Sequence, residues 1–302
     1  MALGPQTAII GLGSMGWGAA VSLLRAGIAT IGVDINQEVL VRFEGEGGQT
    51  ADSPAAAAEN ADIVFVFVVN EKQTREVLFG VGGAAAAAKP GTVFALCVTM
   101  PPSSSIQIAQ ELEAKGMLVI DAPVSGGSLK ASNGEMTIMA SGPQEAFAIA
   151  EPALGAISAK VFRLSDQPGM GSQVKMINQL LAGVHIAATA EAMALGAGIG
   201  VDLETLYDVI RECAGNSWMF ENRGAHIVKG DYTPHSAVDI FVKDLGIVAS
   251  ESAANNFSTP MTATALDLFQ EASAAGMGRE DDAALAKLLA RRGRVKLPGM
   301  TQ

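Results

Sequence analysis

Near its start the chain combines an apolar segment, a glycine-rich turn, a helical stretch and a second apolar segment that ends in an acid. The first apolar segment covers residues 8–10, and the second covers residues 30–33 and leads directly to Asp34. The turn between them begins with Gly11-Leu12-Gly13-Ser14-Met15-Gly16. This order predicts two parallel strands joined through a tight turn and a helix, which severely limits the folds open to the chain.

Each glycine of the turn has a physical reason. Gly11 allows the chain to turn sharply out of the strand, and Gly13 has no side chain to keep a pyrophosphate away from the backbone. Gly16 lets the helix pack closely on the sheet, and the free N–H groups at the helix start favour phosphate charge. We therefore expect residues 11–16 to bind a dinucleotide, the alternative being a merely tight strand–helix turn.

The acid predicts which dinucleotide binds. Asp34 lies 18 residues after Gly16, close to the spacing at which a carboxylate accepts hydrogen bonds from a ribose diol. The same carboxylate would repel a 2′-phosphate, and residues 35–37 contain no basic side chain to pair with one. The pattern favours NAD over NADP, although Arg42 would weaken this preference if its side chain folded back.

Composition bounds the remaining possibilities. A chain of 302 residues has room for two domains, and 49% hydrophobic against 17% charged residues excludes a disordered protein. The net charge of −11 argues against nucleic acid as a partner. Two cysteines provide no disulfide framework, and the sequence holds no metal-ligand motif, so we expect no metal. The chain start lacks the basic segment of a signal peptide, which predicts a cytoplasmic protein.

Two regions of different character follow each other along the chain. Residues 1–165 alternate apolar strands with helices, which predicts a Rossmann-type, mostly parallel α/β sheet domain. Residues 166–302 show only helical periodicity, which predicts an all-helical domain. We expect this domain to contribute to the substrate site and to the contacts of an oligomer. Besides 8–10 and 30–33, the predicted strands are 63–69, 93–98, 117–120, 136–140 and 160–164. The predicted helices of the first domain include 54–59, 73–78, 84–88, 102–115 and 144–157.

One stretch of the second region is apolar enough to consider a membrane. Residues 177–201 are nearly free of charge and long enough to span a bilayer. Polar residues such as His185 interrupt the stretch, however, and no basic segment flanks it as an anchor. A helix that is apolar nearly all round is otherwise buried all round. We therefore expect no membrane partner, but a long helix that joins the domains and is buried between domains or subunits.

Polar and small residues follow several predicted strands, at the edge where open parallel sheets bind ligands. Val69 and Asn70 come at the end of the third strand, and Thr99 follows the fourth. The fifth strand leads to Ser125, Gly126 and Gly127, whose N–H groups can form a concave nest for a carboxylate. An ordinary Gly-Gly turn is the alternative.

The long helix carries a lysine where exposure is hard to explain. Lys175 lies at its start, and at 100° per residue one face collects small and polar residues. The members of this face are Gly171, Lys175, Asn178, Ala182, His185 and Thr189. A buried lysine loses its proton more readily than an exposed one, which suits proton transfer to and from a substrate oxygen. For Lys175 the alternative to a catalytic role is a side chain that reaches solvent at the helix start. For His185 the alternative is a hydrogen-bonded histidine of the core.

Four motifs in sequence order now make a resemblance visible over essentially the full chain. They are the turn 11–16, residues 121–127, residues 171–178 and Lys243-Asp244-Leu245-Gly246. Together they resemble the β-hydroxyacid dehydrogenases, the family of 3-hydroxyisobutyrate dehydrogenase-like and tartronate semialdehyde reductase-type enzymes. Within that family, residues 214–223 and 230–239 resemble members that oxidise a four-carbon sugar acid.

The resemblance implies an NAD-dependent enzyme that oxidises the CH–OH group of a small sugar acid and forms a homodimer or homotetramer. It implies that Lys175 is catalytic, that Asn178 holds the substrate oxygen, and that Ser125, Gly126 and Gly127 bind the substrate carboxylate. It also implies that Val69, Asn70, Thr99 and Lys243 contact the cofactor, although Lys243 could instead form a surface pair with Asp239.

Three other readings remain open on the sequence alone. One is a dehydrogenase for another short hydroxyacid, such as a tartronate semialdehyde or 3-hydroxyisobutyrate-type enzyme. Another is an imine reductase-like enzyme on the same fold, against which Lys175 counts. The third is a non-catalytic NAD sensor, which would need the glycine turn and Asp34 but no lysine aligned with Asn178.

Overall fold

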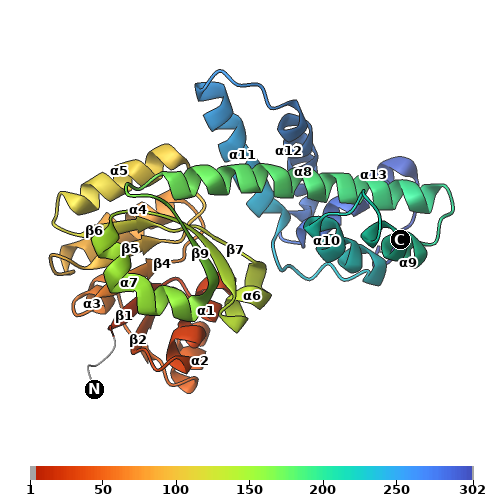
Figure 1. The fold of residues 1–302 in the computed structure, drawn as a ribbon. Helices are drawn as coiled ribbons and strands as arrows, with labels where there is room; N and C mark the ends of the chain where they lie inside the picture. The colour runs from red at the N-terminus through yellow and green to blue at the C-terminus, as the bar shows by residue number, and fades with distance from the viewer. Residues whose placement is uncertain (1–4, 301–302) are drawn as a thin grey trace. The chain divides into compact units, whose positions relative to one another are not determined.

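The computed structural model describes residues 5–300 and divides into two compact units between Lys175 and Met176. The first unit is an α/β structure in which a sheet lies between layers of helices (Figure 1). Its strands are β1 (Thr7–Ile10), β2 (Thr30–Val33), β3 (Gln49–Thr50), β4 (Ile63–Val66), β5 (Val93–Leu96), β6 (Leu118–Asp121), β7 (Val124–Ser125), β8 (Met136–Ser141) and β9 (Ser158–Ser165). Its helices are α1 (Ser14–Arg25), α2 (Gln37–Gly45), α3 (Pro54–Ala58), α4 (Glu71–Phe79), α5 (Pro102–Glu113), α6 (Gly127–Asn133) and α7 (Gln144–Ile157), with a 3₁₀ turn η1 (Ala84–Ala86).

The sheet has the order β3-β2-β1-β4-β5-β6-β8-β7, and β9 pairs with β8. The first six strands run parallel, whereas β8 lies antiparallel to β6 and β7. The strand order reverses beside β1, the point at which open parallel sheets bind nucleotides. The mostly parallel Rossmann-type sheet predicted from the sequence is confirmed.

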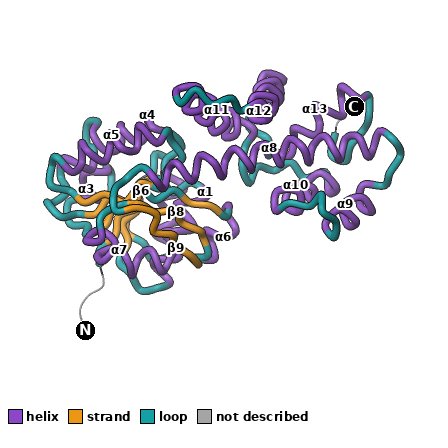
Figure 2. Tube along the Cα trace, turned by 45° about the horizontal axis from the view of Figure 1, so that its top comes forward, coloured by secondary structure: helices purple, strands orange, loops and turns teal. Residues whose placement is uncertain are grey.

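Alternating side chains of the parallel strands build two cores, one on each face of the sheet. Ile9 and Phe65 point to the core covered by α1, α2 and α7. Ala8 and Val64 point to the opposite core, which α3, α4 and α5 cover. Figure 2 shows the orange strands between these two helix layers. The central strands β4 and β5 are apolar at every position and buried on both faces, as is typical of parallel strands.

The sequence misjudged some local elements of this unit. The alanine run 84–88, expected to be a helix, forms only the three-residue turn η1. Glycines at 80, 82 and 83 precede it and Pro90 follows it, so too few residues remain for helical turns to form. The helices α2 and α6 were not predicted, although Asn36 caps α2 by accepting a hydrogen bond from the Glu38 N–H.

As the sequence predicts, the part of the second unit that the structure describes, up to residue 300, contains only helices apart from an isolated bridge between Ala237 and Asp281. Its helices are α8 (Met170–Gly198), α9 (Leu203–Arg211), α10 (Trp218–Lys229), α11 (Val238–Ala254), α12 (Pro260–Ala272) and α13 (Leu285–Gly293), with short turns η2 (Ser273–Met277) and η3 (Asp282–Ala284). One apolar core, which includes the stacked rings of Phe241 and Phe269, holds them together.

The division between the units falls inside α8, whose first turns belong to the first unit. The sequence places the boundary earlier, between residues 165 and 166, where β9 ends. The strands β1–β9 all precede either boundary. The extent of each separately folding domain stays a prediction.

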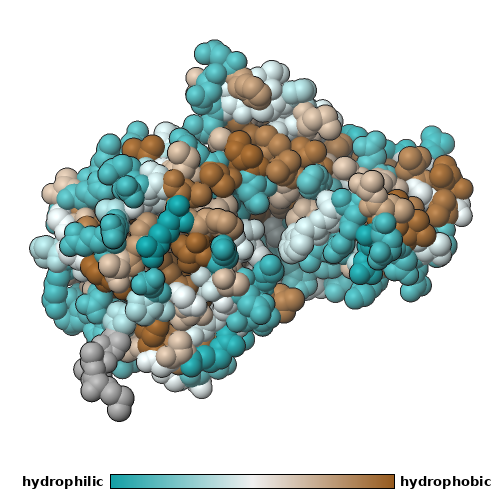
Figure 3. All heavy atoms as spheres, in the orientation of Figure 1, coloured by the Kyte–Doolittle hydropathy of each residue, from teal (hydrophilic) through white to brown (hydrophobic). Residues whose placement is uncertain are grey.

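The long helix α8 is covered on one face only. By length and composition it could cross a membrane, and 44% of its most apolar window is buried in the structure. Its other face exposes an apolar stripe at helical spacing, formed by Met170, Val174, Ile177, Leu181 and Leu195. Hydrophobic side chains along α8 are visible in Figure 3. Within a single chain, α8 is therefore buried on one face and exposes an apolar stripe on another.

Buried charges hold α10 to the segment that precedes α13. The Arg223 guanidinium donates to both carboxylate oxygens of Asp282, and His226 Nδ1 lies 3.0 Å from Asp281 Oδ1. Burial opposes ionisation of Asp281, but the hydrogen bond to His226, the charge of Arg223 and the His235 N–H outweigh it and lower its pKa.

The lowered pKa of Asp281 predicts an acid-dependent loss of stability. An acid whose pKa is lower in the folded state stabilises that state above its ordinary value of 3.8, and the contribution disappears as pH falls through the lowered value. Asp281→Asn should therefore cost about 1–3 kcal/mol at pH 7 and progressively less below pH 4. Urea unfolding followed by circular dichroism at several pH values measures the difference. An equal cost at pH 3 and pH 7 would contradict the assignment.

Candidate active site

The glycine turn has the geometry that the sequence predicts. Gly11 has a φ of +94°, and a Cβ there would lie 2.4 Å from the Phe67 carbonyl oxygen. A Cβ on Gly16 would lie 1.9 Å from the Gly11 carbonyl oxygen, so both positions exclude side chains. A Cβ on Gly13, by contrast, would meet nothing within 4 Å. The turn is therefore tightly packed at its two ends and open at its centre, where a pyrophosphate would approach.

The start of α1 fits an anionic ligand. Gly13 is its N-cap and provides no side-chain hydrogen bond, so the helix presents backbone N–H groups and the positive end of its dipole. The half-buried Asp34 at the end of β2 accepts hydrogen bonds from the N–H groups of Leu12, at 2.7 Å, and Asn36, at 2.9 Å. A carboxylate has about four acceptor positions, which leaves two for a ribose diol. These residues fit a bound dinucleotide.

Arg42 is held by an aromatic ring. Its guanidinium carbon lies 3.9 Å from the centre of the Trp17 ring, a cation–π contact between α2 and α1. This stacking binds the side chain that the sequence singled out as a possible partner of a 2′-phosphate. The contact thus favours the NAD preference that Asp34 predicts.

The residues after β4 and β5 have structural roles besides their predicted contacts with the cofactor. Asn70 caps α4 by accepting a hydrogen bond from the Gln73 N–H, while the Gln73 side chain accepts one from the Val69 N–H, both at 2.9 Å. This arrangement resembles a capping box, except that Gln73 accepts from the N–H of Val69, one residue before the cap. The spacing of Asn70 and Gln73 could have revealed it. Thr99 is half-buried beyond the end of β5.

The small residues after β6 form a tight, glycine-dependent turn. Ser125 ends β7, and Gly126 and Gly127 follow with φ values of +135° and +71°, a region that side chains rarely adopt. The turn starts α6, which packs against α1, where Gly18 allows the backbone of Ala131 to approach closely. The predicted carboxylate nest is thereby fixed to the helix that begins at the glycine turn.

A buried carboxylate fixes the first turn of α8 to the sheet. Asp121, the last residue of β6, is fully buried. Its Oδ2 accepts hydrogen bonds from the N–H groups of Gly169, at 3.0 Å, and Ser172, at 2.7 Å, and its Oδ1 accepts one from the Ser172 hydroxyl at 2.6 Å. Burial raises the pKa of Asp121, and these hydrogen bonds oppose that shift. We call this arrangement the Asp121 anchor.

A second strand end contributes to the Asp121 anchor. The Ser141 hydroxyl at the end of β8 accepts a hydrogen bond from the Gly171 N–H at 2.9 Å and lies 3.4 Å from Asp121 Oδ2. A Cβ on Gly171 would lie 2.5 Å from the Met139 carbonyl oxygen, so only glycine permits this close approach. The motif 171–178 therefore begins with a glycine for packing reasons.

Lys175 follows the Asp121 anchor by one helical turn. Only 7% of its surface is exposed, which confirms that this lysine is buried rather than reaching into solvent. The polar face of α8 that includes Lys175, Asn178 and His185 lies about a quarter turn from the exposed apolar stripe, because residues are spaced 100° apart. Asn178 and His185 are half-buried.

The motif that begins at Lys243 lies on α11 in the second unit. The Lys243 ammonium forms an ion pair with Asp244 Oδ1 at 2.6 Å. The alternative partner weighed from the sequence, Asp239, accepts a hydrogen bond from the Ser273 hydroxyl at 2.6 Å. Lys243 is about one-fifth exposed, and Asp244 is buried.

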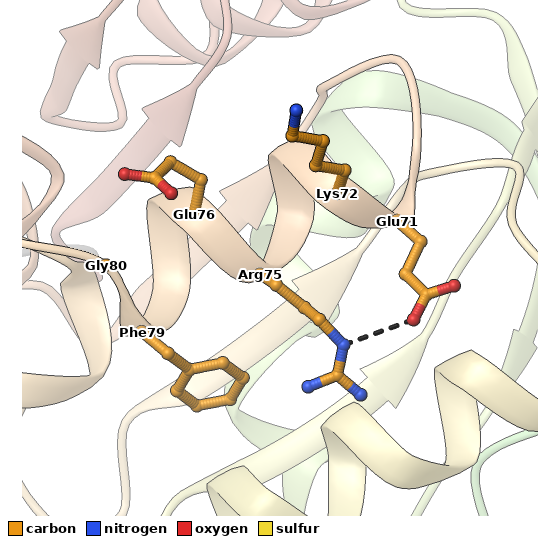
Figure 4. A pocket seen from close by; sticks show the side chains of 6 residues that line it. All are labelled: Glu71, Lys72, Arg75, Glu76, Phe79 and Gly80. Atoms are coloured by element: carbon orange, nitrogen blue, oxygen red, sulfur yellow. Dashed lines mark hydrogen bonds and ion pairs between the residues drawn. The ribbon is translucent and has the colours of Figure 1, made fainter.

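A hollow on the surface of the first unit lies along α4, from its first residue to its C-cap. Glu71, Lys72, Arg75, Glu76, Phe79 and Gly80 line it (Figure 4). Arg75 pairs with Glu71 and with Glu111, at 3.1 and 2.8 Å, so its charge is already neutralised. None of the predicted site residues lines this hollow. Among residues 5–300, no group of three or more His, Cys, Asp or Glu side chains could hold a metal ion.

Comparisons with known proteins cover both units. Residues 6–165 match the NAD binding domain of 6-phosphogluconate dehydrogenase, and residues 169–289 match the NAD-binding domain of NADP-dependent 3-hydroxyisobutyrate dehydrogenase. The chain is 53% identical to the L-threonate dehydrogenase of Cupriavidus necator, over 97% of this chain and 98% of that protein. It is 51% identical to the L-threonate dehydrogenase of Escherichia coli K12, over 96% of both chains.

The chain belongs to the β-hydroxyacid dehydrogenase family. A crystal structure described as 3-hydroxyisobutyrate dehydrogenase from Salmonella typhimurium is 51% identical and has a TM-score of 0.90, with 94% of this chain and 99% of that chain covered. As a β-hydroxyacid dehydrogenase, the protein is an NAD-dependent enzyme that acts on a CH–OH group. The resemblance seen in its four motifs is confirmed.

The Asp121 anchor predicts how substitutions affect this dehydrogenase. Asp121→Ala should destabilise the first unit by about 1–3 kcal/mol, because buried N–H groups lose their acceptor. Asp121→Asn should cost less, since the amide oxygen can accept from both N–H groups while its nitrogen donates to Ser172 Oγ. Urea unfolding measures both. Equal stability of Asp121→Ala and the unmodified protein would show that the anchor contributes nothing.

Proposed function

We propose that the protein oxidises L-threonate to a 2-oxo-tetronate with NAD, and that Lys175 accepts the hydroxyl proton. The observation that carries the proposal is the burial of Lys175 one turn after the Asp121 anchor, in a chain 53% identical to an L-threonate dehydrogenase. A lysine shielded from water and fixed on an anchored helix suits proton transfer at a defined substrate oxygen.

The roles of the chain's residues follow from their chemistry. Ser125, Gly126 and Gly127 bind the substrate carboxylate through hydroxyl and N–H donors. Asn178 binds the reacting hydroxyl, and the Lys175 amine accepts its proton as the C–H bond breaks. NAD, when bound, supplies the hydride acceptor.

The cofactor contacts also belong to the proposal. The backbone of residues 11–16 binds the pyrophosphate, and Asp34 accepts hydrogen bonds from the ribose. Val69, Asn70 and Thr99 contact the nicotinamide half, and Lys243 neutralises phosphate charge. This assignment rests on the open centre of the glycine turn, on the two acceptor positions that remain at Asp34 and on the family motifs.

The exposed stripe of α8 supports a homo-oligomer, a homodimer or a homotetramer. Val174, Ile177 and Leu181 are each more than one-third exposed and lie on one helical face. A contiguous apolar patch on the surface of a protein marks an interaction site. This patch stands out because the chain as a whole carries a net charge of −11. A second copy of the chain provides an equivalent stripe, as two-fold symmetry requires.

A second substrate has specific support. The Salmonella structure described as a 3-hydroxyisobutyrate dehydrogenase shares 51% identity with this chain, as much as an L-threonate dehydrogenase does. A 3-hydroxyisobutyrate-type acid could use the same lysine and the same carboxylate nest, because it too carries a hydroxyl and a carboxylate. Substrate identity is therefore the first question for experiment.

Turnover on a substrate panel tests the proposal. The purified protein should produce NADH with L-threonate faster than with D-threonate, D-glycerate or 3-hydroxyisobutyrate, and should prefer NAD to NADP. Lys175→Ala should reduce kcat by about two orders of magnitude or more and leave NAD binding intact, because a general base is lost. Preferential oxidation of 3-hydroxyisobutyrate would favour the second candidate, and near-normal kcat in Lys175→Ala would remove the lysine from the mechanism.

The mass of the protein in solution tests the oligomer. Light scattering on a size-exclusion column should give a multiple of 30.9 kDa. Leu181→Glu should shift it toward the monomer, because a charge in an apolar interface is costly. Val81→Glu is the matched control, since Val81 is a fully exposed valine of the first unit. A monomeric unmodified protein would contradict the proposal.

A further inference from the structure

A chain of polar contacts in the second unit connects the predicted substrate residue of α8 with the predicted cofactor residue of α11. Asn178 Nδ2 donates to Gln179 Oε1 at 2.9 Å, and Gln179 Nε2 donates to Asp244 Oδ2. The other carboxylate oxygen of Asp244 pairs with the Lys243 ammonium at 2.6 Å. Gln179 and Asp244 are both buried, with 8% and 2% of their surfaces exposed.

The direction of every hydrogen bond in this chain follows from chemistry. Asp244 forms an ion pair with the Lys243 ammonium, and a carboxylate in an ion pair only accepts hydrogen bonds. Gln179 must therefore turn its NH₂ group toward Asp244, which leaves its carbonyl oxygen facing Asn178. That oxygen can only accept, so Asn178 must turn its own NH₂ group toward Gln179. A flip of either amide would place two donors or two acceptors together.

We propose that Gln179 and Asp244 are positioning residues that fix the orientation of the Asn178 amide. An amide nitrogen carries two hydrogens, so Asn178 keeps one N–H for the substrate hydroxyl oxygen after donating the other to Gln179. This inference rests on the proposed function, in which Asn178 holds the reacting oxygen. The inference adds Gln179, which directly follows the motif 171–178 and belongs to none of the four family motifs.

The loss of Gln179 has a defined consequence. Without its carbonyl oxygen the Asn178 amide can flip and present oxygen in place of N–H to the substrate. Asp244 would also lose a donor in a buried position, which is costly for a charged group. Binding of the acid should suffer, whereas the residues proposed to bind the dinucleotide in the first unit remain unchanged.

Three variants test the proposal. Gln179→Leu removes both polar atoms at similar size, and Gln179→Glu replaces the amide with a carboxyl group. Gln270→Leu is the matched control, because Gln270 is an exposed glutamine on α12. Each protein is measured for kcat and KM with L-threonate and NAD, for L-threonate affinity by calorimetry in the presence of NADH, for NADH affinity and for thermal unfolding.

Gln179→Leu should weaken L-threonate affinity and lower kcat/KM about tenfold or more, with NADH affinity within twofold of the unmodified protein. Gln270→Leu should change neither quantity. A folded Gln179→Leu protein that binds and oxidises L-threonate normally would overturn the proposal. If the unmodified protein oxidises none of the four acids, the proposed function fails instead, so the two failures are distinguishable.

Gln179→Glu gives a readout that a purely structural role would not produce. A protonated carboxyl group has one O–H donor and one carbonyl acceptor, in the arrangement of the original amide. Deprotonation places a second carboxylate against Asp244 and removes the donor, with Lys243 as the one cation described next to Asp244. The kcat/KM of this variant relative to the unmodified protein should therefore rise as pH falls. A ratio that stays constant with pH would overturn the proposal, even if Gln179→Leu fails to fold.

Discussion

The buried carboxylate of Asp121 links the sheet to the helix that carries Lys175. It accepts hydrogen bonds from two backbone N–H groups and one hydroxyl at the start of α8, which would otherwise have no partners in a buried place. Removal of a charge from water is costly unless hydrogen bonds compensate for it. The donors of the first turn of α8 can do so only when the helix starts in this position. This contact fixes the start of α8 to the sheet one helical turn before Lys175.

The sequence predicts the first unit well because its signals are local. Gly11 and Gly16 must be glycines for steric reasons that the sequence pattern already contains, and the structure shows the corresponding close contacts. The central strands were similarly predictable, since apolar runs mark β1, β2, β4, β5 and β6. The two-residue parallel strand β3 has no apolar run and was not predicted. The helix expected at residues 84–88 was wrong because propensity was weighed without the glycines and the proline around it.

The candidate site was harder to predict where contacts join distant segments. Lys175 could be singled out because a lysine in an apolar helix is unusual, but its anchor pairs residues about fifty positions apart. Gln179 and Asp244, 65 positions apart, carry no joint signal in a single sequence. The spacing of Asn70 and Gln73 is typical of a helix cap, but the sequence analysis assigned Asn70 only to the cofactor and did not predict the cap. Spacing therefore identified the chemical groups, and packing determined their orientation.

The two tryptophans of the chain give the protein a built-in optical distinction between its units. Trp17 is half-buried in the first unit and stacked under Arg42, whereas Trp218 at the start of α10 in the second unit is 54% exposed. Indole fluorescence shifts to longer wavelength as water surrounds the ring, so in the folded state Trp218 should emit at longer wavelength than Trp17. Replacing either one by phenylalanine leaves a single emitter, with which the unfolding of one unit can be followed separately from that of the other.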